Sequence, residues 1–230
     1  MKNIFIMTVM SILLGNFEVS AQKSVALTFD DGPNTTTTPK VLDKLEKYNV
    51  VGSFFVIGDN INEESAKVMK RASDMGCDIE NHSKSHQHMS KLTEEQLKNE
   101  ISYTTEKIES AISKKVEFFR PPYIDTNELM FKAIDLTFIC GQGAEDWVKE
   151  VTSAQRAKKI LDTIKDGDVI LLHDFDNNDA TVDALDEIIS TLKERGYKFV
   201  TVTELFKEKG ITPQKGVMYT NRSDDKKMYN

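Results

Sequence analysis

Apolar positions along the chain follow two alternating patterns, short β-rich runs and longer stretches with helical spacing. The run 24–29 (SVALTF) is rich in strand-forming residues. In 38–49 the apolar residues recur every three or four positions, and Pro39 suits a first helical turn. The pattern predicts strands at 24–29, 52–58, 77–81, 116–120, 136–142, 168–174 and 197–202. It predicts helices over 38–49, 62–76, 93–112, 126–135, 153–165, 179–196 and 203–210.

Strand and helix alternate about seven times without a long gap, which is the signature of a single parallel α/β domain. A closed or distorted barrel and an open doubly wound sheet both fit this alternation. The segment 211–230 is polar and aperiodic, so we expect a loose C-terminal tail after a domain that covers 22–210.

The first 21 residues differ from the rest of the chain. Lys2 precedes an apolar stretch over 4–14, and the segment ends in the small residues Val19-Ser20-Ala21. This order is typical of a secretory signal peptide cleaved after Ala21. The apolar stretch is shorter than the roughly 20 residues that span a bilayer. We therefore expect export to the periplasm or the extracellular space, with no membrane span after cleavage.

Composition and charge narrow the class of partner. The 230 residues are 39% hydrophobic and 29% charged, as in ordinary globular proteins. The net charge of −7 argues against nucleic acid, whose binding needs a basic face. An exported protein could pair Cys77 with Cys140, but buried free thiols fit the sequence equally well.

Ionisable residues gather where the predicted strands end. In a parallel α/β fold the carboxyl ends of the strands meet at one edge, where reactive groups collect. Five strands end in or just before such residues, namely Asp30-Asp31, Asn81-His82, Arg120, Asp146-Trp147 and His173-Asp174. This distribution predicts one site at that edge.

The residue types at this edge suit a hydrolytic metal centre. His82 and His86 are four residues apart, so on a helix they would share a face and could converge on one ion. Two histidines and a carboxylate leave a metal position open for water. Asp30 and Asp31 could then divide the work of base and ligand, and the cation would offset their mutual repulsion. His88 breaks the spacing and is predicted to be an ordinary surface histidine.

A calcium loop is the competing use of acidic residues. The segment 174–185 places acids at EF-hand positions, but Asp179 stands where glycine is required and Leu185 where the bidentate acid belongs. We therefore predict a solvated, helix-capping loop in this segment.

Five short motifs resemble those of a known family. In chain order they are TFDDGP (28–33), HSKSH (82–86), RPPY (120–123), EDW (145–147) and LLHD (171–174). Together they are similar to the motifs of the polysaccharide deacetylases, the NodB-homology domain of carbohydrate esterase family 4. The resemblance covers the chain from Ser24 to about Phe206. It implies a distorted (β/α) barrel with about seven parallel strands.

The resemblance also implies an activity and a set of roles. Members of the family remove acetyl groups from sugars with one divalent ion, commonly zinc and sometimes cobalt or nickel. By motif match, the implied metal ligands are Asp31, His82 and His86. The implied catalytic residues are Asp30 as base, Arg120 to hold it, His173 as acid and Asp146 to pair with His173. The resemblance further implies that the Tyr123 backbone N–H faces the oxyanion and that Trp147 and Leu171 shape the acetyl pocket.

The acetylated polysaccharide or oligosaccharide substrate is not fixed by these motifs. N-deacetylation of an N-acetylglucosamine polymer of the peptidoglycan or chitin type is the leading hypothesis. An O-acetyl esterase on acetylated xylan, a non-catalytic carbohydrate-binding relative and a hydrolase of small cyclic amides are the alternatives. Ile124 stands where the family motif often has glycine, which leaves the sugar specificity open.

Overall fold

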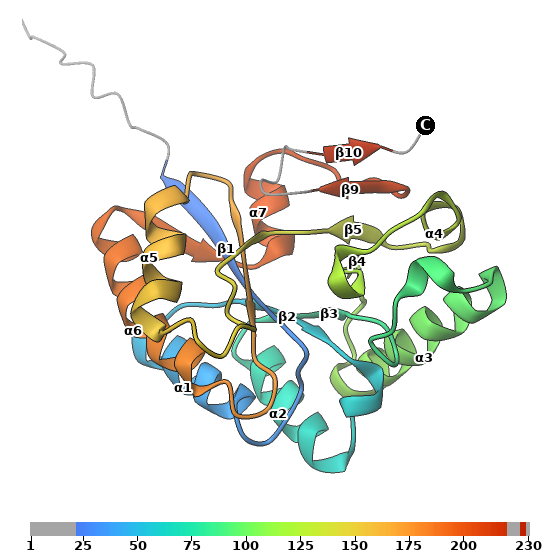
Figure 1. Cartoon of the computed structure of the whole chain (residues 1–230), viewed down its shortest axis with the longest axis horizontal. Helices are drawn as coiled ribbons and strands as arrows, with labels where there is room; N and C mark the ends of the chain where they lie inside the picture. The colour runs from blue at the N-terminus through green and yellow to red at the C-terminus, as the bar shows by residue number, and fades with distance from the viewer. Residues whose placement is uncertain (1–21, 220–225, 229–230) are drawn as a thin grey trace, which may run out of the picture.

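The computed structural model of the chain describes residues 22–219 and 226–228, in which strands and helices alternate (Figure 1). The strands are β1 (Lys23–Asp30), β2 (Ser53–Val56), β3 (Asp78–Asn81), β4 (Phe118–Phe119), β5 (Thr137–Ile139), β6 (Gln142–Gly143), β7 (Val169–His173), β8 (Tyr197–Val200), β9 (Val217–Tyr219) and β10 (Lys226–Met228). The helices are α1 (Thr38–Tyr48), α2 (Glu63–Asp74), α3 (Glu94–Ile112), α4 (Glu128–Ala133), α5 (Ser153–Thr163), α6 (Asp179–Glu194) and α7 (Val202–Glu208). The predicted signal peptide, 1–21, lies outside the described residues. Within 22–219 and 226–228, no helix combines the length and the hydropathy that a membrane span requires.

All ten strands of the described part of the chain belong to one sheet. Its order is β10-β9-β5-β4-β3-β2-β1-β7-β6, and β8 pairs with the start of β1. Every pairing is parallel except that of β9 with β10. The parallel α/β prediction is therefore confirmed, but nine strands run parallel rather than about seven.

The segment predicted as one strand over 136–142 is in fact two. β5 pairs with β4 and β9 near one end of the sheet, whereas β6 pairs with β7 at the other end. One short run thus joins the two ends of the sheet through Cys140 and Gly141, and the sheet curves into a distorted barrel. A Cβ atom on Gly141 would lie 2.9 Å from Cβ of Leu171, so this crossing requires glycine. The open doubly wound alternative is wrong.

The alternation of side chains along β1 decides what faces the barrel interior. Val25, Leu27 and Phe29 join the core cluster that packs against the surrounding helices. Residues one position out of phase, Ala26, Thr28 and Asp30, therefore point to the other side, into the barrel. The parallel register then sets Asp30 beside His173 of β7. Strand periodicity thus delivers both groups to the same end of the barrel.

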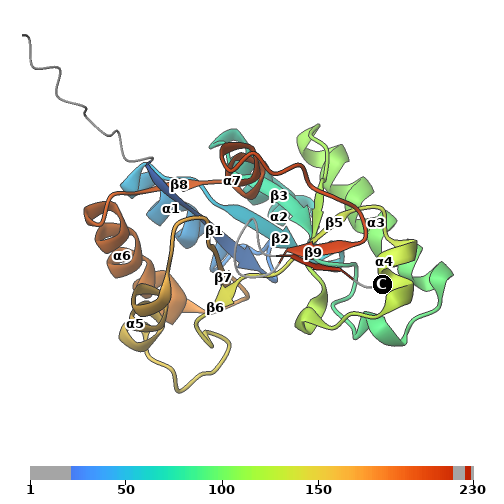
Figure 2. The same cartoon turned by 90° about the horizontal axis from the view of Figure 1, so that it is seen from above.

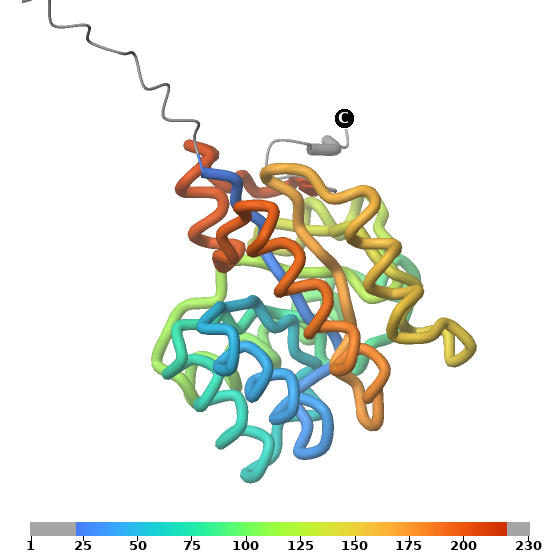
Figure 3. The backbone as a smooth tube through the Cα atoms, turned by 90° about the vertical axis from the view of Figure 1, so that its left-hand side faces the viewer, coloured from blue at the N-terminus to red at the C-terminus, as the bar shows by residue number. Residues whose placement is uncertain are grey.

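Helices cover the outside of the barrel. Figure 3 shows α1 and α2 lying alongside one another, and Figure 2 places α5 next to α6 on one flank. The start of α5 is fixed by a capping box, in which Thr152 and Gln155 each bind the other's backbone N–H. Most predicted helix boundaries lie within a few residues of those observed. These helices therefore follow from local sequence alone.

The predicted loose tail over 211–230 is wrong in part. Val217, Met218 and Tyr219 form β9, are buried, and pair in parallel with β5. Figure 1 shows β9 and β10 lying beside β5. Three apolar residues are too few to show a period, so only the pairing with β5 reveals this strand. The domain therefore extends at least to 219.

Candidate metal centre and active site

The turn after β1 separates the two aspartates. Asp30 ends the strand and is buried inside the barrel, whereas Asp31 adopts a left-handed φ of 78°. The carboxylates therefore point in different directions. Asn60 Nδ2 donates to the Asp31 carbonyl at 2.8 Å, and the N–H of Gly32 donates to Asp174 Oδ1 at 3.1 Å. A Cβ atom on Gly32 would lie 2.7 Å from Asp174 Oδ2, so glycine is needed for this approach.

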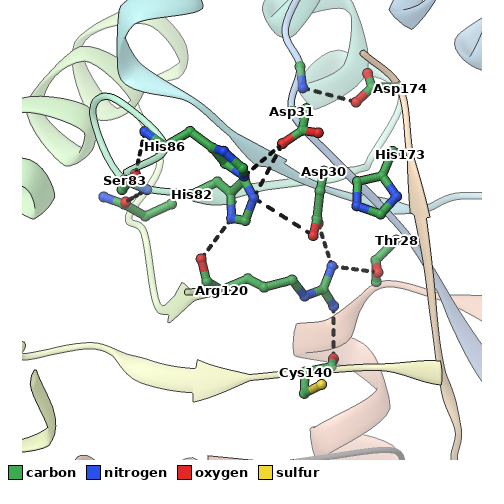
Figure 4. A network of polar contacts seen from close by, with 12 residues as sticks. Thr28, Asp30, Asp31, His82, Ser83, His86, Arg120, Cys140, His173 and Asp174 are labelled. Carbon is green, nitrogen blue, oxygen red and sulfur yellow. Dashed lines mark hydrogen bonds and ion pairs between the residues drawn. The ribbon is translucent and has the colours of Figure 1, made fainter. Parts of the chain in front are cut away.

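Asp31, His82 and His86 converge on one point (Figure 4). Asp31 Oδ1 lies 3.4 Å from Nε2 of His82 and 3.3 Å from Nε2 of His86. One potential ligand atom from each residue lies within 4.8 Å of the other two. His82 Nδ1 lies 2.7 Å from the carbonyl of Arg120, which makes Nδ1 the protonated nitrogen and leaves the Nε2 lone pair free. The three predicted ligands are therefore brought together.

The residues of this triad fit a divalent metal ion. Within the described residues, Asp31 Oδ1 is buried and has no hydrogen-bond partner. Burial alone would raise the pKa of Asp31, but the neighbouring histidines favour its ionised form and hold the pKa of Asp31 below its usual value. Burial and the neighbouring His82 lower the pKa of His86, which favours the neutral imidazole that binds metals. An orphaned carboxylate oxygen beside two imidazole nitrogens is a donor set typical of zinc.

The two histidines do not share a helical face, contrary to the sequence prediction. The segment 82–86 is a loop in which Ser83 and His86 have left-handed φ values of 65° and 55°. Its backbone N–H groups are held by acceptors on neighbouring elements. Those of Lys84 and Ser85 both donate to Glu100 Oε2 on α3 at 2.9 Å. Glu100, which was not identified from the sequence, thus holds the loop that carries both histidines, although it is about 15 residues away in the chain.

Arg120 fixes Asp30 from below the metal centre. Its NH1 group donates to Asp30 Oδ1 at 2.6 Å and to Thr28 Oγ1 at 2.9 Å, and NH2 donates to the Cys140 carbonyl at 2.9 Å. The guanidinium carbon lies 4.1 Å from the ring centroid of Phe55. Asp30 Oδ2 remains directed toward the triad, 3.9 Å from His82 Nε2. The predicted pairing of Arg120 with Asp30 is therefore present in the structure.

His173 and Asp146 form a second pair on the other side of Asp30. Asp146 is fully buried, and its Oδ1 lies 2.8 Å from His173 Nδ1, while Oδ2 accepts the backbone N–H of His173 at 2.7 Å. Burial alone would lower the pKa of His173, but the hydrogen bond and charge of Asp146 outweigh it and raise the pKa to about 9. At neutral pH, His173 is therefore an imidazolium that can give up a proton.

A pocket of about 490 Å³ opens over these groups. It is lined by both aspartates and by His82, His86 and His173, together with apolar side chains that include Ile124, Trp147 and Leu171. Trp147 is 56% exposed and meets His173 edge-on at 5.5 Å, and Tyr123 is 60% exposed and meets His86 edge-on at 4.7 Å. The predicted substrate residues therefore line the same pocket as the predicted metal ligands.

His88 does more than the sequence analysis expected of a surface histidine. Its side chain is exposed, but its ring stacks on Tyr123 at 4.2 Å, and Nδ1 lies 3.3 Å from Asp125 Oδ2. It therefore supports one wall of the pocket.

Two other sequence expectations are resolved by the structure. The segment 174–185 is not solvated throughout, because Asp174 is fully buried and burial raises its pKa to about 7. Cys77 is buried and Cys140 half-buried, and both are free thiols. The disulfide that an exported protein could form between them is therefore not present here. Cys140 instead lines the pocket.

Comparisons with known proteins agree with this geometry. The family model described as polysaccharide deacetylase matches residues 18–139. A bifunctional xylanase/deacetylase of Pseudobutyrivibrio xylanivorans is 49% identical over 84% of this chain, which spans 32% of that relative. A peptidoglycan-N-acetylglucosamine deacetylase of Bacillus cereus is 38% identical over 79% of this chain and 68% of the relative. The family 4 acetyl xylan esterase of Clostridium thermocellum, solved with a cobalt ion, superposes with a TM-score of 0.81 at 43% identity, covering 83% of this chain and 93% of that one.

Proposed function

Because the chain belongs to the polysaccharide deacetylase family and is therefore a hydrolase, we propose that it is an exported, metal-dependent enzyme that removes acetyl groups from an acetylated glycan. One observation supports this proposal most directly. A triad that could hold a metal ion, a buried carboxylate and the imidazole of His173 line one pocket, and Figure 4 shows how these side chains lie. The predicted signal peptide and the cell-wall glycans named for the relatives support the export part of the proposal.

Asp31, His82 and His86 would hold one divalent ion, with zinc as the first candidate and cobalt or nickel as alternatives. When bound, such an ion supplies Lewis-acid chemistry, which lowers the pKa of water and polarises a carbonyl group. The cobalt in the acetyl xylan esterase structure belongs to that protein and supports the choice of a divalent ion here.

Asp30 is proposed as the general base. Arg120 binds only its Oδ1 atom, which leaves Oδ2 on the side of the metal ligands to accept a proton from the attacking water. The Arg120 guanidinium also gives this buried carboxylate a charged partner. The geometry therefore gives Asp30 both a fixed direction and a free oxygen.

His173 is proposed as the general acid. Its Nδ1 is bound to Asp146, so Nε2 is the nitrogen left to protonate the leaving amine or alcohol in the pocket. The Tyr123 backbone N–H would donate to the oxyanion, and Trp147 and Leu171 would border the acetyl methyl group. Trp147 meets His173 edge-on and limits the space beside the imidazole.

The identities of the relatives favour a change in the order of substrates. From the sequence, N-acetylglucosamine polymers were expected to be the leading substrate. Two relatives named for xylan, however, are 43% and 49% identical to this chain, whereas the peptidoglycan deacetylase of Bacillus cereus is 38% identical. We therefore place acetylated xylan first and N-acetylglucosamine polymers second.

Acetate release tests the proposal. The chain from residue 22 would be stripped of metal, refilled with zinc or cobalt, and given acetylated xylooligosaccharides and tetra-N-acetylchitotetraose in parallel. Metal-dependent release by the wild type, lost in His82→Ala, is the expected result, and the preferred substrate decides between ester and amide. If metal binds but neither substrate loses acetate, the proposed activity is wrong and a carbohydrate-binding role takes its place.

A further inference from the structure

Arg156, in the first turn of α5, is buried beneath the pocket but does not line it. Its NH1 group donates to Asn178 Oδ1 at 2.6 Å and to Thr181 Oγ1 at 2.8 Å, where α6 begins. Burying a guanidinium is costly unless its hydrogen bonds are specific and complete. The partners that hold this charge therefore indicate what it does.

Both partners of NH1 contact the His173–Asp146 pair. Thr181 Oγ1 donates to Asp146 Oδ2 at 2.9 Å, and Asn178 Nδ2 donates to the His173 carbonyl at 2.9 Å. Arginine can only donate, so its bond to the threonine oxygen leaves the hydroxyl proton for Asp146. In the same way, its bond to Asn178 Oδ1 fixes the amide orientation that directs Nδ2 at His173. Arg156 thus sets the direction of both contacts.

The other nitrogens of Arg156 reach the loop that carries Asp146 and Trp147. Nε donates to the Val151 carbonyl at 2.9 Å, and NH2 donates to the Val148 carbonyl at 3.3 Å. One planar side chain therefore joins this loop to the start of α6. A lysine has no such fork and cannot make these bonds together.

We propose that Arg156 is a positioning residue for the proton donor, acting through Thr181 and Asn178 to hold Asp146 and His173 in their productive orientation. The inference rests on the proposed role of His173 as general acid. We call the hydrogen-bonded chain of Arg156, Thr181 and Asn178 the relay. The relay should affect the rate only for substrates whose leaving group needs a proton. The acetate ester of 4-nitrophenol does not, because its phenolate leaves unprotonated at neutral pH.

The test compares Arg156→Met, Arg156→Lys and Thr181→Val with the wild type. The matched control is Arg195→Met, because Arg195 also joins α6 to α5, through the Leu161 carbonyl, but at the far end of both helices. Each zinc-loaded protein would be assayed on the better of the two oligosaccharides and on 4-nitrophenyl acetate. All three relay variants are expected to lower kcat on the oligosaccharide about 10- to 100-fold with little change in KM. The aryl ester should lose less than about threefold, and Arg195→Met should match the wild type on both substrates.

A second readout does not depend on activity. In the metal-free protein, the ¹⁵N-bound Nδ1 proton of His173 reports its bond to Asp146, and this signal should shift or broaden in the relay variants. In the relay variants, kcat should also begin to fall at a lower pH than in the wild type, on the alkaline side of its pH profile. Besides Asp146, the ionisable groups Asp30, Asp31 and His86 act on His173, and no variant changes them.

The outcomes separate the inference from the proposed function. If Arg156→Met and Thr181→Val lower the melting temperature but leave kcat, the pH profile and the His173 signal unchanged, Arg156 is only structural and the inference is overturned. If Arg156→Met does not fold, Thr181→Val decides the matter in the same way. If His173→Gln itself keeps the wild-type rate on the oligosaccharide, the proposed acid role is what fails.

Discussion

Replacing Arg120 by methionine should strongly destabilise the protein, and a second substitution at Asp30 should recover stability without recovering activity. Arg120 is fully buried and makes three hydrogen bonds, to Asp30, Thr28 and the Cys140 carbonyl. The methionine has a similar volume but leaves the Asp30 carboxylate buried without its charge partner. The variant therefore tests whether the base is held by an ion pair.

The expected cost follows from these contacts. Removing one partner of a buried ion pair costs about 3–5 kcal/mol. Losing the bonds to Thr28 and Cys140 adds about 1 kcal/mol each. A total of about 5–7 kcal/mol is comparable with the whole stability of many domains, so Arg120→Met should be barely folded at 25 °C.

Adding Asp30→Asn to Arg120→Met should restore about 2–3 kcal/mol, because the double variant contains no unpaired buried charge. It should still lack activity, since the asparagine cannot accept a proton. Urea unfolding of the metal-free proteins measures the two changes in stability without a cation compensating Asp30, and acetate release measures the activity. The control is Arg71→Met, whose exposed partners Asp43 and Glu46 predict a loss below about 1 kcal/mol.

Two results would contradict this role of the Arg120–Asp30 pair. If Arg120→Met costs no more than Arg71→Met, the buried pair does not hold the site together. If the double variant is no more stable than Arg120→Met alone, the cost does not come from an unpaired Asp30 carboxylate. Activity in the double variant would remove Asp30 from the role of base.

Three further predictions concern the acid, the metal and the barrel closure. His173 has a folded pKa of about 9, above its ordinary value of 6.5, so it stabilises the metal-free fold below pH 6.5, and this contribution is lost as the pH rises through 9. Asp146→Asn should abolish that trend in melting temperature and lower kcat at pH 7 by about 10²- to 10⁴-fold, whereas an unchanged trend would contradict the pairing. Zinc at 100 times its Kd should raise the unfolding free energy of the metal-free enzyme by about 2.7 kcal/mol, and His86→Ala should remove most of that increase if the triad binds the ion. Gly141→Ala should destabilise by about 1–3 kcal/mol because of the 2.9 Å approach to Leu171, and wild-type urea stability would show that the crossing can relax.

Much of the fold and part of the site could be predicted from the sequence because they depend on local patterns. Strand and helix periodicity located most elements of the barrel, and strand ends located Asp30, Asp31, His82, Arg120, Asp146 and His173. The pairing of Arg120 with Asp30 and of Asp146 with His173 came from the family resemblance, and the structure contains both contacts.

Other features were decided only by tertiary contacts. The short strands β6 and β9 exist because β7 and β5 supply their partners, and two or three residues carry no period of their own. The histidines converge through a loop held by Glu100, although their spacing suggested a helix. In the sequence, Arg156 cannot be told from a surface arginine of an amphipathic helix, because its partners Asn178 and Thr181 come from α6 and the residue before it.

Local patterns predict the elements but not the buried side-chain contacts, because the two depend on interactions over different distances along the chain. A backbone prefers its conformation through interactions with residues a few positions away, so local sequence predicts most elements, their order and the polar ends of the strands. The direction of a buried side chain depends on donors and acceptors that arrive from distant segments. Contacts between distant segments therefore place Arg156, Thr181 and Asn178 in the hydrogen-bond network of Asp146 and His173. Such contacts also close the barrel through the short crossing at Gly141.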